Sequence, residues 1–415
     1  MSADTRVADA PIYMDHHATT PTDPEVLEAM LPCFAETFGN PSSTTHVYGA
    51  AAREVTERAR GKVAELLGAE SADEIIFTSG ATESDNLAIT GLAHQYRDKG
   101  RHIITCSIEH KAVLQACKRL ELEGFRVSYL QVDRDGLVDP DDVKRAICRD
   151  TILISIQYAN SEVGTIQPLE VIGNLARQNG IPFHTDAVQA VGKIGTNVQE
   201  LNVDLLSLSA HKMYGPKGVG ALYVRRDLNP IPLIVGGPQE KGRRAGTLNV
   251  PGIVGLGKAC EIARRDLEPE GRRLLRLRDR LSEGLLKRVG LAYLNGHPVK
   301  RLPNNINISF EYVAAEALIE SIPEVAVSSG SACTSQSAEP SYVLLAMGVP
   351  KALALSALRF GLGKANTAAQ VEHVVKLIKT NVERLRNLSP LYMAKDPRRK
   401  QPRSFKSSHV PALMG

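Results

Sequence analysis

Between residues 74 and 226 the chain alternates short runs of β-branched and apolar residues with longer segments of helical periodicity. Seven runs are expected to form strands, over 74–78, 102–106, 126–132, 151–159, 181–187, 204–210 and 219–226. Helical patterns at 110–124 and 168–180 separate several of them. This alternation is typical of helices packed on a mostly parallel sheet. The pattern therefore predicts a large α/β domain with a seven-stranded sheet.

Two helices are expected before the first of these strands. Asp23 can cap the first helix and Pro24 suits its first position, and apolar residues then recur to Phe38, just before Gly39. A second helix is expected over 50–67, ending at Gly68.

The pattern changes after residue 263 and predicts a smaller α+β domain. We expect a basic amphipathic helix at 271–289, a strand at 304–310, a helix at 314–322, a loop at 328–341, a strand at 357–363 and a last helix at 367–388. The large domain is expected to span residues 21–263. The small domain would combine 1–20 with 264–390 and carry the loop at 328–340, and 391–415 would be a disordered basic tail.

Composition and charge narrow the class of protein. Of the 415 residues 43% are hydrophobic and 23% charged, as in ordinary globular proteins. The net charge is +4, but residues 395–406 alone carry +5, which leaves about −1 elsewhere and argues against nucleic acid as a main partner. No run approaches the ~20 apolar residues of a membrane span, and no secretory signal is evident. We therefore expect a cytoplasmic protein with no membrane partner.

The strongest chemical feature is a lysine that follows a predicted strand. The segment 207–220, SLSAHKMYGPKGVG, places Lys212 beside Ser209 and His211 and before a glycine-rich turn. A lysine that binds a carbonyl covalently must be fixed, desolvated and able to lose its proton. Taken alone, Lys212 would be interpreted as an ordinary surface lysine.

Three other features follow predicted strands. The turn TSGATES at 78–84 opens a helix whose free N–H groups could bind a phosphate, although an ordinary helix cap would look similar. Asp186 ends a strand three residues before Gln189 and could face a pyridine nitrogen, although a lone Asp there is more often a cap. His110 opens a helix and could stack on a flat ring. Because ligands bind at the carboxyl ends of parallel strands, the turn at 79–84, Asp186 and Lys212 are expected at one edge of the sheet.

In this order, these features resemble the cysteine desulfurases, a branch of the fold-type I pyridoxal-phosphate enzymes of aminotransferase class V. The resemblance runs from Tyr13 to about Tyr392. Its motifs are YMDHHATTP, FGNPSSTTHVYG, FTSGATESDNLAI, EHK at 109–111, SAHKMYGPKGVGALYVRR, AGTLNVP, SSGSACTS, EPSYVL and LRFGLG. It implies a fold-type I pyridoxal-phosphate transferase with the large sheet domain and the smaller α+β domain expected above.

The resemblance also implies a role for each matched residue. Lys212 would hold pyridoxal phosphate and move protons, Asp186 would pair with the ring nitrogen, Gln189 would contact the ring hydroxyl, and His110 would stack on the ring. The residues implied to bind the phosphate are Ala81, Thr82, Ser209, His211 and, from a second subunit of a homodimer, Thr247. Arg359, helped by Asn40, would hold the carboxylate of the L-cysteine substrate. Ser161 stands where relatives usually have a cofactor-contacting asparagine, and alternation points Asn160 elsewhere.

Cys333 lies in a run of small polar residues, SSGSACTSQS at 328–337, that would pack poorly in a core. A nucleophilic cysteine needs exposure and access to its thiolate form. The resemblance implies that Cys333 receives the sulfur as a persulfide while alanine leaves, and that its loop belongs to the longer-loop branch, which delivers sulfur to protein acceptors. It implies no intrinsic metal site, although Cys333 could transiently ligate a partner's iron–sulfur cluster.

The main hypothesis is a cysteine desulfurase that supplies sulfur for iron–sulfur cluster assembly, other thio-cofactors or tRNA thiolation. Another pyridoxal-phosphate reaction, β-elimination or selenocysteine lysis, would not require Cys333. An inactive sulfur-relay or assembly subunit is the alternative from another class, and retention of Lys212, Asp186, His110 and Cys333 argues against it. The segment after Tyr392 departs from the ending with which relatives dock an iron–sulfur scaffold, so the sequence does not identify the acceptor.

Overall fold

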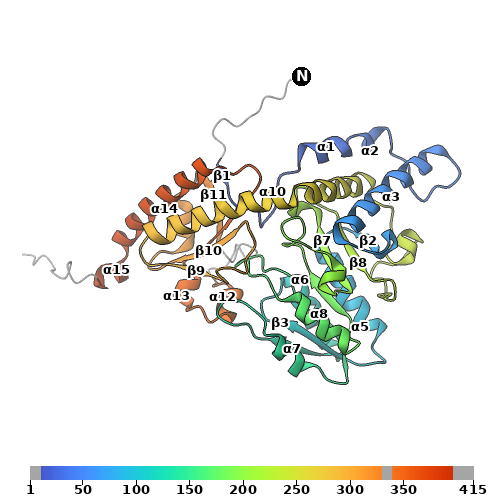
Figure 1. The fold of residues 1–415 in the computed structure, drawn as a ribbon, viewed down its shortest axis with the longest axis horizontal. Coiled ribbons are helices and arrows are strands. Elements are labelled where there is room, and N and C mark those ends of the chain that lie inside the picture. Colours follow the sequence, from blue (N-terminus) through green and yellow to red (C-terminus); the bar gives the residue numbers. More distant parts are fainter. Residues whose placement is uncertain (1–10, 330–338, 396–415) are drawn as a thin grey trace, which may run out of the picture.

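A seven-stranded sheet forms the centre of the larger part of the molecule, which the computed structural model describes over residues 11–329 and 339–395 (Figure 1). Its strand order is β2-β8-β7-β6-β5-β3-β4. The strands are β2 (Ile75–Thr78), β3 (His102–Cys106), β4 (Arg126–Leu130), β5 (Thr151–Ser155), β6 (Phe183–Asp186), β7 (Leu205–Ser209) and β8 (Gly220–Val224). β8 runs antiparallel to both of its neighbours, β2 and β7, and the other four pairings are parallel, so the expected mostly parallel sheet is confirmed.

Helices cover both faces of this sheet because strand residues alternate between two cores. Ile75 and Phe77 join the core shared with α3, α8 and α10, whereas Ile76 joins the core shared with α5 and α6. The helices of this part are α3 (Val47–Leu67), α4 (Ala81–Asn86), α5 (Leu92–Gln95), α6 (Lys111–Leu122), α7 (Pro140–Ala146), α8 (Leu169–Gln178) and α9 (Val198–Leu201). Gly68 ends α3 with φ of 65°, a conformation that favours glycine.

The smaller part has an antiparallel sheet of order β12-β13-β10-β9 and a short parallel pair, β1 with β11. Its strands are β1 (Ile12–Tyr13), β9 (Ala292–Asn295), β10 (Asn305–Phe310), β11 (Val325–Ala326), β12 (Ser328–Ser329) and β13 (Ala357–Gly361), and its helices are α11 (Ala315–Glu320), α12 (Tyr342–Ala346), α13 (Lys351–Ala354), α14 (Ala368–Leu388) and α15 (Pro390–Lys395). One face of α14 packs with α10 and β10 in a separate core. The domain boundaries given above stay predictions.

The helix expected at 271–289 is longer than predicted. Helix α10 (Val250–Arg288) runs for 39 residues through both parts of the molecule (Figure 1). Its first half packs closely on α3, where a Cβ at Gly257 would lie 2.7 Å from Ala59 Cα. Its second half packs against α14. The sequence pattern missed the first half because that half is buried on several sides and lacks a clear amphipathic stripe.

Two other expectations are corrected at the chain ends. The single helix expected from Pro24 to Phe38 is two helices, α1 (Pro24–Met30) and α2 (Pro32–Ala35), because Pro32 has no N–H to continue the first one. The first residues of the expected disordered tail form α15, and the rest of that tail lies outside the described residues. Cys333 also lies outside them. Within the described ranges, no helix is both long and apolar enough to span a membrane.

Candidate active site

A cavity of about 960 Å³ opens at the carboxyl-terminal edge of the large sheet. The wall of the cavity is formed by residues at the ends of β2, β3, β5, β6 and β7. Residues 17–19, 339–343 and Arg359 complete it. Ten of the thirteen residues named from the sequence line this one cavity: Ala81, Thr82, His110, Ser161, Asp186, Gln189, Ser209, His211, Lys212 and Arg359. Asn40 and Thr247 are exposed and do not line it in a single chain.

Lys212 is held at the end of β7 by backbone groups of the N-terminal segment. It closes a 3₁₀ turn, Ala210–Lys212, and its Nζ donates to the carbonyl oxygens of His17 at 2.6 Å and Ala18 at 2.7 Å. The carbonyl oxygen of Lys212 accepts in turn from Lys193 Nζ at 2.9 Å. Burial and the charge of Lys212 lower the pKa of Lys193 to about 7. A second, partly buried amine therefore supports the segment that carries Lys212.

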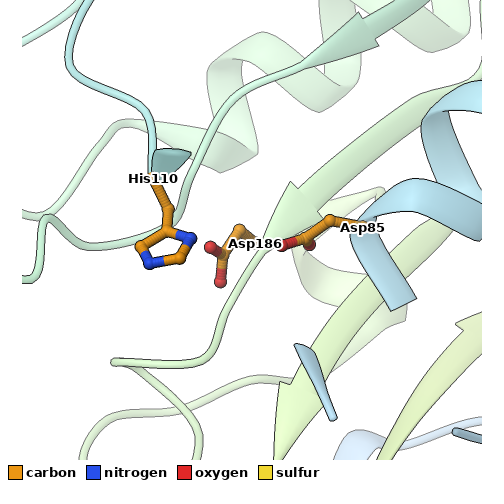
Figure 2. A group of neighbouring side chains, drawn as sticks. All are labelled: Asp85, His110 and Asp186. Atoms are coloured by element: carbon orange, nitrogen blue, oxygen red, sulfur yellow. The ribbon is translucent and has the colours of Figure 1, made fainter. Parts of the chain in front are cut away.

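Asp186 and His110 lie side by side at the floor of the cavity, with Asp85 of α4 beyond Asp186 (Figure 2). One ligand atom from each of the three lies within 4.8 Å of the others, so the group could hold a metal ion. The Oδ1 of Asp186 accepts from Val188 N–H at 3.0 Å, which leaves its other oxygen for a ligand. An imidazole next to a buried carboxylate equally suits a flat heteroaromatic ring, with the ring nitrogen on Asp186.

Burial raises the pKa of Asp186, and the charges of His110 and Lys212 oppose this effect. Burial and the nearby Asp186 raise the pKa of Asp85 as well, and a hydrogen bond with Ser207 opposes this effect. Two buried carboxyl groups this close cannot both be ionised without a large cost. The cations that oppose the effect of burial act on Asp186 and not on Asp85, so Asp85 is the member of the pair whose neutral form is favoured.

The other end of the cavity suits a phosphate. Gly80 precedes α4 with φ of 151°, and a Cβ placed on Gly220 would lie 2.8 Å from Gly80 Cα, so two glycines let β8 approach this turn. The hydroxyl of Ser209 faces Gly80 across the turn, since a Cβ there would lie 3.9 Å away. His211 Nδ1 bonds to Thr19 Oγ1 at 3.1 Å, and burial, with the charges of nearby lysines, lowers its pKa to about 4. A neutral imidazole, a hydroxyl and helix N–H groups together suit phosphate oxygens.

Arg359 of β13 supplies a buried cation on the small-domain side. Its guanidinium donates to Asp15 Oδ1 at 2.8 Å, to Ser328 Oγ at 2.8 Å and to the Ser161 carbonyl at 3.1 Å. Its Nε is buried without a partner among the described residues. Because these three bonds use only part of its five N–H donors, Arg359 can still bind a carboxylate.

Ser161 lines the cavity, whereas the side chain of Asn160 forms hydrogen bonds with backbone groups. The Asn160 amide donates to the Ile108 carbonyl at 3.0 Å and accepts from Glu162 and Val163 N–H groups. It is therefore committed to the backbone of this loop. The neighbouring serine is the side chain left to face a ligand.

Three buried residues near this cavity were not singled out from the sequence as parts of the site: His17, Asp85 and Glu109. Glu109 precedes His110 and accepts from Gln157 N–H at 2.7 Å and Cys106 Sγ at 3.0 Å. Burial raises its pKa to about 8. All three stand inside motifs of the family resemblance, so their placement in those motifs was the available signal.

Comparison with known proteins agrees with this geometry. The model of the family "Aminotransferase class-V" matches residues 12–374. A "Cysteine desulfurase IscS" from Anaeromyxobacter sp. (strain K) is 55% identical over 93% of this chain and 96% of its own length. A solved structure titled "NIFS-LIKE PROTEIN" has a TM-score of 0.84 at 40% identity, covering 90% of this chain and 99% of that one.

A second solved structure, "SspA in complex with cysteine", has a TM-score of 0.76 at 41% identity and covers 85% of this chain and 98% of that one. The family model, the full-length match to a curated relative and the two structures agree on one assignment. This chain belongs to the class-V aminotransferases and, within them, to the cysteine desulfurases.

Proposed function

We propose that this protein converts L-cysteine to L-alanine and transfers the sulfur to its own Cys333, for delivery to an acceptor protein. The observation that carries the proposal is the convergence of Lys212, Asp186 and His110 with Arg359 in one cavity. A fixed amine, a buried carboxylate and an imidazole suit pyridoxal-phosphate chemistry, and a buried guanidinium suits an amino-acid carboxylate.

Pyridoxal phosphate is the cofactor of this family in general, and the residues of this chain fit it. Asp186 would pair with the ring nitrogen, Gln189 would contact the ring hydroxyl, and Lys212 would bind the aldehyde carbon covalently. Ala81, Thr82, Ser209 and His211 would take the phosphate, and Ser161 would contact the cofactor through its short hydroxyl. When bound, the cofactor supplies an electron sink for the carbanion formed next to the substrate amine.

Two side chains are suited to move protons in the cavity. The Nδ1 of His110 accepts from Ala112 N–H at 3.2 Å, so its transferable proton sits on Nε2. Lys212 Nζ is within hydrogen-bond distance of two carbonyl oxygens, which would hold the neutral amine in place while it takes and returns the α-proton. His110 would accept or donate the proton of the substrate sulfur.

The sulfur step balances without an external oxidant. The Cys333 thiolate attacks the substrate sulfur and forms an S–S bond, the substrate C–S bond breaks, and its electron pair stays on carbon, which is then protonated to give alanine. Cys333 keeps the sulfur as a persulfide. Arg359 would hold the substrate carboxylate throughout, and its bonds to Asp15 and Ser328 would fix its orientation.

We further propose a cytoplasmic homodimer in which Thr247 completes the phosphate site of the other subunit. Thr247 is exposed in a single chain, as such a role requires. The segment around Asn40 also exposes four large apolar side chains, those of Phe34, Phe38, Val47 and Tyr48. Their exposure supports burial of residues 34–48 by a second copy of the chain. The sulfur acceptor would be a protein such as an iron–sulfur scaffold, and Asn40 would help to bind substrate in the assembled dimer.

The test is an assay with L-cysteine and a reductant that follows alanine and sulfide together. We expect equal amounts of both from the wild type and loss of both in Cys333→Ala and Lys212→Ala. Cys148→Ala is the matched control, because Cys148 is an exposed cysteine outside the cavity. Full activity of Cys333→Ala would refute the persulfide step and favour β-elimination, and absence of cofactor absorbance in the wild type would favour an inactive relay subunit.

A further inference from the structure

His17 and Gln189, 172 residues apart in sequence, are joined by two hydrogen bonds in the wall of the cavity. Gln189 Nε2 lies 3.1 Å from the carbonyl oxygen of His17, and His17 Nδ1 lies 2.8 Å from Gln189 Oε1. Both side chains are buried, with 1% and 6% of their surface exposed. The backbone oxygen that accepts from Gln189 is the same one that accepts from Lys212 Nζ.

These contacts determine which atom is which. A carbonyl oxygen only accepts, so the Gln189 atom next to it must be the NH₂ group, and the atom next to His17 Nδ1 must be the amide oxygen. An amide oxygen also only accepts, so His17 Nδ1 must carry a hydrogen. The tautomer of His17 therefore follows from its own backbone oxygen, which fixes the Gln189 amide.

The surroundings keep His17 neutral in this tautomer. Its Nε2 is buried without a partner among the described residues, and the cations that face the ring are Arg359, Lys193 and Lys212. Burial, with those charges, lowers the pKa of His17 well below its usual value. The ring fits because Gly361 has no side chain: a Cβ there would lie 2.8 Å from His17 Cδ2. The motifs at 13–21 and 358–363 therefore pack against each other to form this part of the cavity wall.

We infer that His17 is a positioning residue that fixes the amide of Gln189 with its NH₂ group toward the cofactor ring. One N–H of that group bonds to the His17 carbonyl, which leaves the second as a donor for the hydroxyl oxygen of the ring. Without the N–H of His17 only the backbone carbonyl oxygen of residue 17 still orients the amide, so its NH₂ group is held less firmly toward the ring. This inference rests on the proposed function, because Gln189 is assigned to the ring hydroxyl there.

The test compares side chains that keep or remove the donor at position 17. In His17→Asn the amide N–H sits where Nδ1–H was, and in His17→Leu no donor remains. The affinity of the apoenzyme for pyridoxal phosphate is measured by absorbance titration, together with the pH dependence of the bound cofactor's spectrum. We expect roughly two- to tenfold weaker binding and a shifted spectral titration in His17→Leu, the range for one lost hydrogen bond, and values within about twofold of wild type in His17→Asn.

A double-mutant cycle separates positioning from general packing. If His17 acts through Gln189, His17→Leu has no further effect in a Gln189→Ala background. An equal loss in both backgrounds, or wild-type binding and spectrum in His17→Leu, would overturn the inference. If His17→Leu does not fold by circular dichroism, His17→Asp replaces it, because Asp has the shape of Asn but offers an acceptor. A wild type that binds no pyridoxal phosphate would refute the proposed function as well.

Discussion

Glu109→Gln should change how the stability of this protein depends on pH. Glu109 is fully buried on the strand-to-helix connection before His110, and burial raises its pKa from 4.5 to about 8. An acid whose pKa is higher in the folded state binds more protons folded than unfolded, so its folded form loses stability as pH rises between the two pKa values. The glutamine of the variant does not titrate, and its amide oxygen can still accept from Gln157 N–H and Cys106 Sγ.

The size of the effect follows from the two pKa values. Between pH 5.5 and 7.5 the unfolding free energy of the wild type should fall by about 2.5 kcal/mol relative to that of Glu109→Gln. A complete one-proton difference would give about 1.36 kcal/mol per pH unit, and the expected slope is somewhat smaller. The variant buries an NH₂ group where the wild type has an oxygen. That cost is the same at both pH values and cancels in the comparison.

Urea unfolding at one protein concentration, at pH 5.5, 6.5 and 7.5, measures the difference. Glu316→Gln is the control, since it makes the same substitution at an exposed acid on α11. Other buried groups titrate in the same range, and they affect wild type and variant alike. A difference between Glu109→Gln and wild type that stays constant from pH 5.5 to 7.5 would refute the reasoning, because it would mean that Glu109 is already ionised at pH 5.5.

Three further predictions concern the cavity. Arg359→Lys should raise KM for L-cysteine about tenfold with a smaller change in kcat, because an ammonium cannot keep the planar bonds to its neighbours and also bind a carboxylate; a kcat loss alone in the alanine assay would contradict this. Asp186→Asn should lower kcat on the order of 100-fold, since an amide does not hold the ring nitrogen protonated, and near-wild-type alanine formation would refute that role. Mixing Thr247→Ala with Lys212→Ala subunits should restore one intact site per mixed dimer, whereas a Thr247 that serves its own subunit would leave the mixture as impaired as its parents.

Much of the fold could be predicted from local patterns. All seven strands of the large sheet lie within the predicted runs, and the end of α3 at Gly68 was predicted as well. Local signals suffice there, because a buried strand needs an apolar run and a helix end needs a residue that tolerates positive φ. Local patterns gave the wrong result at Pro32, because the apolar period continues past a residue that has no N–H for the helix. They also gave the wrong result at the first half of α10, because that half is buried on several sides and has no polar face.

The sequence by itself determined the family and the chemical groups of the cavity, because strand ends in a parallel sheet meet at one edge and the motifs that carry Lys212, Asp186 and His110 all follow strands. Only the tertiary structure decided how these groups are held. The contact of His17 with Gln189, the proximity of Asp85 to Asp186 and the bond that Arg359 donates to Asp15 join residues 100 or more positions apart. Such contacts depend on packing between elements, and no periodicity along the chain encodes them.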